Sequence, residues 1–192
     1  MHAAESPRDR GTPDRDDASS IGGPLPRIIA GPRPLRTSRL HRLDRVFTDA
    51  PIYFVTLCVQ PRRRVLDDPR VHAAVVRFGR RGTAVGCRLG RYVLMPDHLH
   101  AFVAFDATAE PAAARLSAWA KALKGCISQA WREAGLGGVR WQKGFFDHVL
   151  RTTESYAEKW GYVALNPVRA GLVSEPGAWP FQGEIHHLDA PL

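Results

Sequence analysis

The order of apolar and polar residues predicts a strand and then a helix in the first half of the chain. Residues 52–60 are mostly apolar and rich in β-branched and aromatic side chains, which is typical of a central strand. Residues 69–81 place Val71, Val75 and Phe78 at helical spacing. The arginines of that segment fall mostly outside the apolar stripe, so we expect an amphipathic helix.

Two further strands and a second helix follow. Apolar runs at about residues 87–95 and 98–105 flank the turn residues Pro96-Asp97, as expected for adjacent strands. The next helix is indicated by apolar residues that step by three or four positions: Leu116, Trp119, Leu123, Ile127 and Trp131. A strand near residues 139–150 and a helix that contains Tyr162 complete the order.

This β-α-β-β-α-β-α order predicts an α+β fold, the ferredoxin-like split βαβ plan with an antiparallel sheet and one appended C-terminal helix. Residues 37–180 would form this single domain. Residues 1–36 are rich in Ser, Pro, Gly, Arg and Asp and cannot bury enough surface to fold alone, so we expect a disordered extension. Residues 181–192 are expected to be a C-terminal tail.

Two histidines, His98 and His100, stand at the start of the apolar run at residues 98–105. Side chains at i and i+2 of a strand point the same way, so His98 and His100 would share one face while Leu99 turns to the other. Two imidazoles on one face can hold a metal ion. Taken alone, the pair is equally compatible with two structural histidines on a half-exposed strand.

The predicted last helix ends near Asn166-Pro167, because the residue before a proline avoids the α region. Tyr162 and Asn166 are four residues apart and therefore neighbours on one helical face, with Glu158 one turn earlier. Tyr156 should face elsewhere. Taken alone, Tyr162 could instead be a buried tyrosine, and Asn166 a residue chosen to end the helix.

Charge favours a polyanionic partner. The net charge is +8 and the isoelectric point is about 10.0. The triplet Arg62, Arg63 and Arg64 follows the first strand, where a loop can place three phosphate ligands together. Lys121 and Lys124 are expected on the solvent side of the second long helix. Trp141, Phe145 and Phe146 are candidate stacking platforms for unpaired bases, although such aromatic residues often fill a core.

Segments for membrane insertion or export are not found. No run of about 18 apolar residues exists, and the start of the chain lacks a charged segment followed by an apolar stretch. We therefore expect a soluble cytoplasmic protein with no membrane partner. The three cysteines are isolated in apolar segments and form no Cys-x-x-Cys pair, which favours reduced structural thiols.

Three segments carry a family resemblance. Residues 92–100, Tyr-Val-Leu-Met-Pro-Asp-His-Leu-His, resemble the HUH single-strand endonucleases in their single-tyrosine transposase form. Residues 145–151 and residues 162–173, the latter Tyr-Val-Ala-Leu-Asn-Pro-Val-Arg-Ala-Gly-Leu-Val, are similar to the REP-associated tyrosine transposases specifically. The resemblance covers roughly residues 37–179. The long N-terminal extension departs from it.

The resemblance implies a chemistry. Tyr162 would be the nucleophile, and Asn166 would join His98 and His100 as a ligand of a divalent metal, Mg or Mn. The substrate would be single-stranded or hairpin DNA, cleaved through a 5′-phosphotyrosine intermediate and then rejoined. Glu158 is our own candidate for the base that takes the tyrosine proton. Relatives imply a monomer or a homodimer with exchanged tyrosine helices.

Two other classes of function stay open on the sequence. A non-catalytic module could grip single-stranded nucleic acid through aromatic and arginine side chains of a ferredoxin-like sheet, and chelators would then leave binding unchanged. A metal-dependent hydrolase with water as nucleophile would use the metal ligands and ignore Tyr162.

Overall fold

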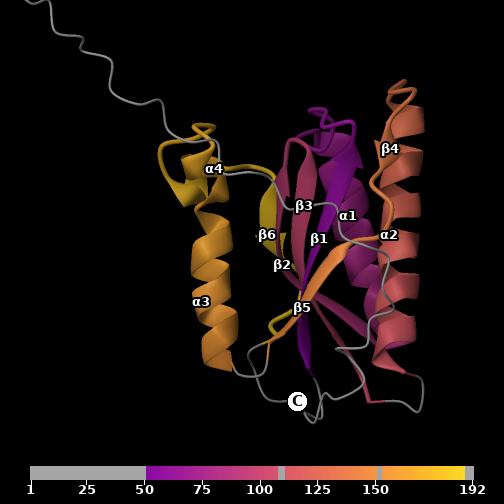
Figure 1. Cartoon of the computed structure of the whole chain (residues 1–192), viewed down its shortest axis with the longest axis vertical. Helices are drawn as coiled ribbons and strands as arrows, with labels where there is room; N and C mark the ends of the chain where they lie inside the picture. The colour runs from indigo at the N-terminus through magenta and orange to yellow at the C-terminus, as the bar shows by residue number, and fades with distance from the viewer. Residues whose placement is uncertain (1–50, 108–110, 151–152, 189–192) are drawn as a thin grey trace, which may run out of the picture. The chain divides into compact units, whose positions relative to one another are not determined.

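Strand β1 (Ile52–Gln60) runs through the middle of an antiparallel sheet in the computed structural model, which describes residues 51–107, 111–150 and 153–188 (Figure 1). One side of β1 pairs with β3 (His98–Phe105), which pairs with β2 (Cys87–Met95). Its other side pairs with β5 (Phe146–Leu150) along one half and with β4 (Arg140–Trp141) at its end. This is the strand order of the predicted split βαβ plan, so the predicted α+β fold is confirmed.

Helices α1 (Pro69–Gly82) and α2 (Ala112–Glu133) cover one face of the sheet (Figure 1). Alternate residues of β1, among them Tyr53, Val55 and Leu57, are buried in that layer. Helix α1 begins after Asp68, whose side chain accepts a hydrogen bond from the Arg70 amide at 2.7 Å and caps the helix. This is the larger of the two apolar layers.

Helix α3 (Thr153–Ala164) packs on the opposite face. There Phe54, Phe102, Tyr156 and Val163 form a second apolar cluster, and the rings of Phe102 and Tyr156 meet edge to face with centroids 4.9 Å apart. The one-turn helix α4 (Asn166–Arg169) follows directly. The appended helix of the prediction therefore covers the sheet face that α1 and α2 leave open.

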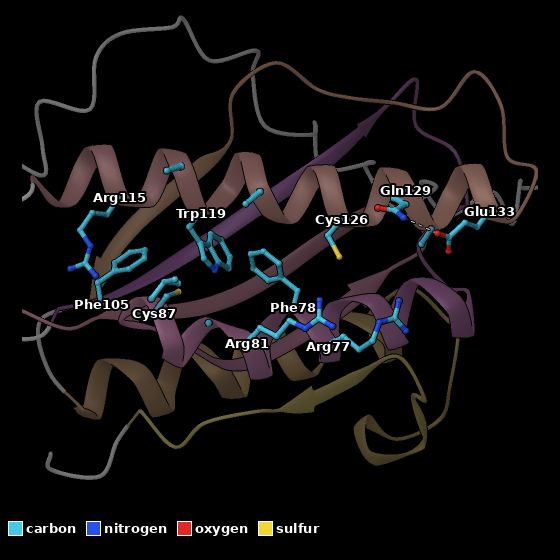
Figure 2. A pocket seen from close by; sticks show the side chains of 15 residues that line it. Arg77, Phe78, Arg81, Cys87, Phe105, Arg115, Trp119, Cys126, Gln129 and Glu133 are labelled. Carbon is cyan, nitrogen blue, oxygen red and sulfur yellow. Dashed lines mark hydrogen bonds between the residues drawn. The ribbon is translucent and has the colours of Figure 1, made fainter.

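A cavity of about 640 Å³ lies between α1 and α2 (Figure 2). Phe78, Trp119 and Cys126 are among the residues that line it, and Arg77 and Arg81 extend along its α1 side. It lies on the α1 and α2 side of the sheet, and neither predicted histidine lines it.

Three details of the predicted elements are corrected. The strand expected over 139–150 is divided into β4 and β5, because the chain turns at Gly144, whose φ of 75° is favourable only for glycine. Helix α3 ends at Ala164, and Asn166 is the first residue of α4 rather than the last of α3. A short strand that the sequence did not predict, β6 (Gln182–Glu184), pairs with β2.

Several expectations fall outside the described residues. The predicted disordered extension at 1–36 and the last residues of the predicted tail are among them. Within the described part of the chain, no helix combines the length and apolar character needed to cross a bilayer.

Candidate active site

His98 and His100 extend from the same face of β3, as the strand alternation predicts. The intervening Leu99 is fully buried in the layer formed by α1 and α2, which turns both imidazoles toward the face that α3 covers. Their ring centroids are 4.7 Å apart and the rings are nearly perpendicular. The ring of Phe54 on β1 stacks beside His100 at 5.4 Å.

Each imidazole is held through Nδ1. His98 Nδ1 lies 2.6 Å from Asp97 Oδ1, and His100 Nδ1 lies 2.9 Å from the Thr56 hydroxyl on the neighbouring strand. In each case Nε2 is the ring nitrogen that is left for another ligand. This is how metal-binding histidines are commonly oriented in proteins.

Burial lowers the pKa of His100 to about 3, and nearby positive charge acts in the same direction. The side chains that contribute are His98, Lys159, Arg169 and Arg62. His100 is therefore neutral at physiological pH, which is the form that binds metals. The effect of Lys159 and Arg169 also shows that the α3 and α4 segment brings positive charge close to the histidine pair.

Tyr162 is exposed and Tyr156 is buried, so the two tyrosines lie on different faces of α3, as the helical geometry predicts. The side chain of Tyr162 is 62% exposed, whereas Tyr156 has no exposed surface. The guanidinium carbon of Arg169 lies 4.1 Å from the Tyr162 ring centroid, and Lys159 Nζ lies 5.9 Å from it. Two cations therefore lie against the ring of the exposed tyrosine.

Phe54 connects the helix to the histidines. Lys159 Nζ lies 4.9 Å from the Phe54 ring, whose other contact is the stacked ring of His100. A continuous series of contacts thus runs from His100 through Phe54 and Lys159 to Tyr162. It brings together residues that lie about 60 positions apart in the sequence.

Asn166 lies at the start of α4, and its side-chain oxygen Oδ1 accepts a hydrogen bond from Arg169 at 2.6 Å. Arg169 also donates to the main-chain carbonyl of Tyr162. An amide oxygen is a suitable ligand for Mg or Mn, so the donor set of two imidazoles and one amide fits a divalent metal, provided that Arg169 releases Asn166. Glu158 is exposed on α3, one turn before Tyr162.

Groups of three or more His, Cys, Asp or Glu side chains that could hold a metal are not found within residues 51–107, 111–150 and 153–188. The predicted site has only two side chains of these types, His98 and His100, and takes its third ligand from the amide of Asn166. The metal site therefore stays a prediction.

The arginine triplet lies next to the histidines. A cavity of about 390 Å³ is bounded by Arg62, Arg63 and Arg64, by the turn residues Pro96 and Asp97 with His98, and by Met95, Ala170 and Leu172. Arg62 Nη1 pairs with Asp97 Oδ2 at 2.7 Å, and Arg64 Nη2 pairs with Asp67 Oδ2 at 2.8 Å. The hydrogen bonds from His98 and Arg62 hold the pKa of the Asp97 carboxyl well below its usual range.

The two predicted DNA-binding lysines lie on α2, which covers the other face of the sheet. Lys121 is exposed, but the expectation that Lys124 points to solvent is wrong. Its Nζ donates to the Gln142 and Gly144 carbonyls at 3.0 and 2.5 Å and lies 5.7 Å from the Trp141 ring centroid. Burial lowers the pKa of Lys124. The Lys124 side chain thus binds the main chain of the loop between β4 and β5. The helical period of the sequence alone cannot predict this contact.

The three candidate stacking residues occupy different environments. Trp141 stacks on Trp131 with centroids 4.8 Å apart, and Phe145 packs partly buried against the layer of α1 and α2. Phe146 pairs with Thr56 across β5 and β1, so its side chain lies on the histidine face, where it is 38% exposed. Only Phe146 among the three therefore offers an open ring beside the candidate site.

Four residues of this site were not singled out in the sequence as functional: Thr56, Asp97, Lys159 and Arg169. Asp97 precedes His98 directly, and Arg169 follows Asn166 by three positions, so their positions in the motifs were a usable signal. Thr56 is 44 residues from His100 and becomes its neighbour only through strand pairing.

No family model matches the sequence. Comparison with curated proteins does find similar chains. A REP-associated tyrosine transposase of Escherichia coli is 28% identical over 93 residues, which are 48% of this chain and 52% of the relative. The chain thus spans about half the length of that relative. A Haemophilus influenzae protein with the same family name is 24% identical over 158 residues, or 77% of this chain and 88% of the relative.

A solved structure shares the fold. It is a REP-associated tyrosine transposase bound to a REP hairpin, with a TM-score of 0.55 and 22% identity over 72% of this chain and 79% of that one. The resemblance in the histidine and tyrosine motifs, the two curated relatives and the shared fold agree with one another. These comparisons support the resemblance of this chain to the REP-associated tyrosine transposases.

Proposed function

We propose that this protein is a metal-dependent single-strand DNA endonuclease and strand transferase that uses Tyr162 as its nucleophile. The observation that carries the proposal is the series of contacts from His100 through Phe54 and Lys159 to Tyr162. It links the predicted metal ligand His100 to the exposed Tyr162. The names of the relatives, and the REP hairpin bound by the related structure, support DNA that forms hairpins at repeats as the substrate.

The reaction is a transesterification. The Tyr162 hydroxyl oxygen attacks the scissile phosphorus, the bond to the 3′ oxygen breaks, and the products are a 5′-phosphotyrosine and a free 3′-hydroxyl. The phenol proton leaves to Glu158 or to water, and the departing 3′ oxygen takes up a proton from water. A 3′-hydroxyl of a second strand end can then attack the phosphotyrosine and rejoin the DNA. Because the bond energy is retained in the phosphotyrosine, no nucleotide cofactor is needed.

His98, His100 and Asn166 would hold the divalent ion, Mg or Mn. When bound, such an ion polarises the scissile phosphate and offsets charge on the leaving oxygen. In the structure, Asn166 Oδ1 accepts a hydrogen bond from Arg169. We infer that Arg169 transfers from the amide to a phosphate oxygen when DNA and metal bind, since a guanidinium binds a phosphate more strongly than a neutral amide.

Positive charge around the site would hold the DNA. Lys159 and Arg169 flank the nucleophile, and the loop with Arg62, Arg63 and Arg64 borders the cavity next to His98. A DNA phosphodiester between the Lys159–Arg169 pair and the arginine loop would face cations on both sides. Such contacts position the DNA backbone but do not recognise its base sequence.

The experiment is an incubation of the protein with end-labelled single strands that form hairpins, with Mn²⁺ or with EDTA, followed by denaturing gel electrophoresis. A labelled band at the mass of the protein plus DNA is expected with Mn²⁺ only, and it should be lost in His98→Ala and His100→Ala. Binding that is unchanged by EDTA, with no covalent band, would indicate a non-catalytic binding module. Cleavage without a covalent band would indicate water as the nucleophile.

A further inference from the structure

The turn between β2 and β3 contains a carboxylate that touches two functional candidates at once. Asp97 Oδ1 lies 2.6 Å from His98 Nδ1, and Asp97 Oδ2 lies 2.7 Å from Arg62 Nη1. The two oxygens of one side chain therefore serve two different partners. His98 is a predicted metal ligand, and Arg62 is the first residue of the arginine triplet.

We propose that Asp97 is a positioning residue that fixes the tautomer of His98 and the orientation of Arg62 together, and so links the metal site to the DNA-binding loop. The inference rests on the proposed function for the role of His98 as a metal ligand. Asp97 itself is not required to touch metal or DNA.

The tautomer follows from hydrogen-bonding capacity. An ionised carboxylate offers only acceptors, so His98 must donate from Nδ1, and the lone pair of its Nε2 is then free. His100 differs, because its Nδ1 partner is the Thr56 hydroxyl, which can either donate or accept. His98 is thus the imidazole of the pair whose metal-binding form is set by its neighbour before any metal arrives.

The backbone around Asp97 is held by other bonds. The Asp97 carbonyl accepts from the Val59 amide at 2.9 Å, and the Pro96 carbonyl accepts from the Val65 and Leu66 amides at 2.8 and 3.1 Å. These bonds join the turn to both ends of the arginine loop without using any side chain. Replacing the Asp97 side chain should therefore leave the loop attached to the turn.

The same loop offers a matched control. Asp67 pairs with Arg64 at 2.8 Å, much as Asp97 pairs with Arg62, and both arginines border the same cavity. No hydrogen bond among the described residues joins Asp67 to a histidine. A change at Asp67 thus removes an aspartate–arginine pair of this loop without touching His98.

The test uses the full chain and two readouts that do not depend on activity. In EDTA, long-range proton–nitrogen NMR spectra report which ring nitrogen of His98 carries the proton, and His98→Ala assigns its signals. Calorimetric titration with MnCl₂ then measures metal affinity. Wild-type protein and Asp67→Ala should both show His98 protonated at Nδ1 and bind Mn²⁺ equally.

Asp97→Ala should shift the His98 proton toward Nε2, because the acceptor at Nδ1 is gone. Its Mn²⁺ affinity should fall roughly 10- to 100-fold, the range typical for removal of a group that orients a metal ligand. Arg62→Ala should weaken single-strand binding but keep the His98 tautomer. If thermal melting shows that Asp97→Ala is unfolded, Asp97→Asn replaces it. Its amide presents an oxygen to one partner and an NH₂ donor to the other, so it should lose either the His98 tautomer or the contribution of Arg62 to DNA binding.

An Asp97→Ala protein that folds, keeps the wild-type His98 tautomer and binds Mn²⁺ as tightly as wild type would overturn the inference. An Asp97→Asn protein that keeps both properties would do the same. The proposed function fails separately: wild-type protein that forms no covalent adduct with DNA would contradict it, whatever the tautomer of His98.

Discussion

The guanidinium of Arg169 lies over the ring of Tyr162, with its central carbon 4.1 Å from the ring centroid. The same guanidinium donates to the Asn166 side chain and to the Tyr162 main-chain carbonyl. One arginine therefore holds both residues that the family motif assigns to chemistry, the predicted nucleophile and the predicted third metal ligand. Tyr162 is 62% exposed, and Lys159 also lies beside its ring, so both cations restrict its orientation.

Tyr162→Phe should abolish the covalent protein–DNA adduct and leave stability within about 0.5 kcal/mol of wild type, because the hydroxyl that is removed belongs to an exposed side chain. Tyr156→Phe is the matched control and should still form the adduct, since Tyr156 is buried against Phe102. Denaturing gels and urea unfolding measure the two effects. If Tyr162→Phe forms the adduct and Tyr156→Phe does not, Tyr156 rather than Tyr162 is the nucleophile.

Arg169→Ala should lower the rate of adduct formation by about 10²- to 10³-fold, the usual effect of removing one group that stabilises transition-state charge. Affinity for Mn²⁺ should stay equal or rise, because Asn166 Oδ1 no longer accepts from a guanidinium. Single-turnover kinetics and metal titration separate the two readouts. A variant that loses Mn²⁺ affinity in parallel with rate would show that Arg169 supports the metal site rather than the phosphate.

The low pKa of His100 predicts a pH dependence of stability. The folded imidazole has a pKa of about 3 and the unfolded one about 6.5, so between these values the unfolded chain binds more protons. Metal-free protein should therefore lose stability as pH falls from about 6.5, by up to about 1.4 kcal/mol per pH unit, with no further loss from this group below about pH 3.

His100→Asn should flatten this slope in urea unfolding measured in EDTA at several pH values. His148→Ala is the control. It removes an exposed histidine from the same sheet face, so it shows whether a change in slope is specific to His100. Equal slopes in wild type and His100→Asn would show that the His100 imidazole can be protonated without loss of the fold.

Within the arginine triplet, Arg63 should contribute most to the salt dependence of DNA binding. Arg62 and Arg64 pair with aspartates, whereas no ion pair among the described residues includes Arg63. Arg63→Ala should reduce the slope of log affinity against log salt for single strands by about 0.7, the value for one phosphate contact. A larger change in Arg62→Ala or Arg64→Ala would mean that DNA displaces the aspartates.

The sequence was sufficient for the parts of the fold that depend on long periodic segments. The strands 52–60, 87–95 and 98–105 have the predicted bounds, because each is a long apolar run that must be buried on the sheet. Strand β6 was not predicted, since Gln-Gly-Glu carries no apolar alternation and its position is determined by pairing with β2. The divided strand at 139–150 depends on the conformation of Gly144, which a hydrophobic pattern does not encode.

The same limit applies to the candidate site. His98 and His100 could be placed on one face from their spacing, and Tyr162 could be separated from Tyr156 by helical geometry alone. Arg62 is 35 residues from Asp97, so their pairing depends on tertiary structure. Lys124 was misplaced because it lies at the border of the apolar stripe of α2, where contact with the β4–β5 loop decides its orientation.

Two neighbouring phenylalanines, Phe145 just before β5 and Phe146 at its start, provide the last prediction. Phe146 pairs with Thr56 on the histidine face and is 38% exposed, whereas Phe145 packs against the layer of α1 and α2. Phe146→Ala should weaken single-strand binding by about 1–3 kcal/mol, the value of one base stacked on an aromatic ring, and leave stability nearly unchanged. Phe145→Ala should instead lower stability, because it leaves a cavity at the edge of the core, while folded protein keeps its DNA affinity. Fluorescence anisotropy with a labelled single strand and urea unfolding measure both variants. If Phe146→Ala destabilises the fold as much as Phe145→Ala and DNA affinity is unchanged, Phe146 is a packing residue and the DNA path does not cross β5.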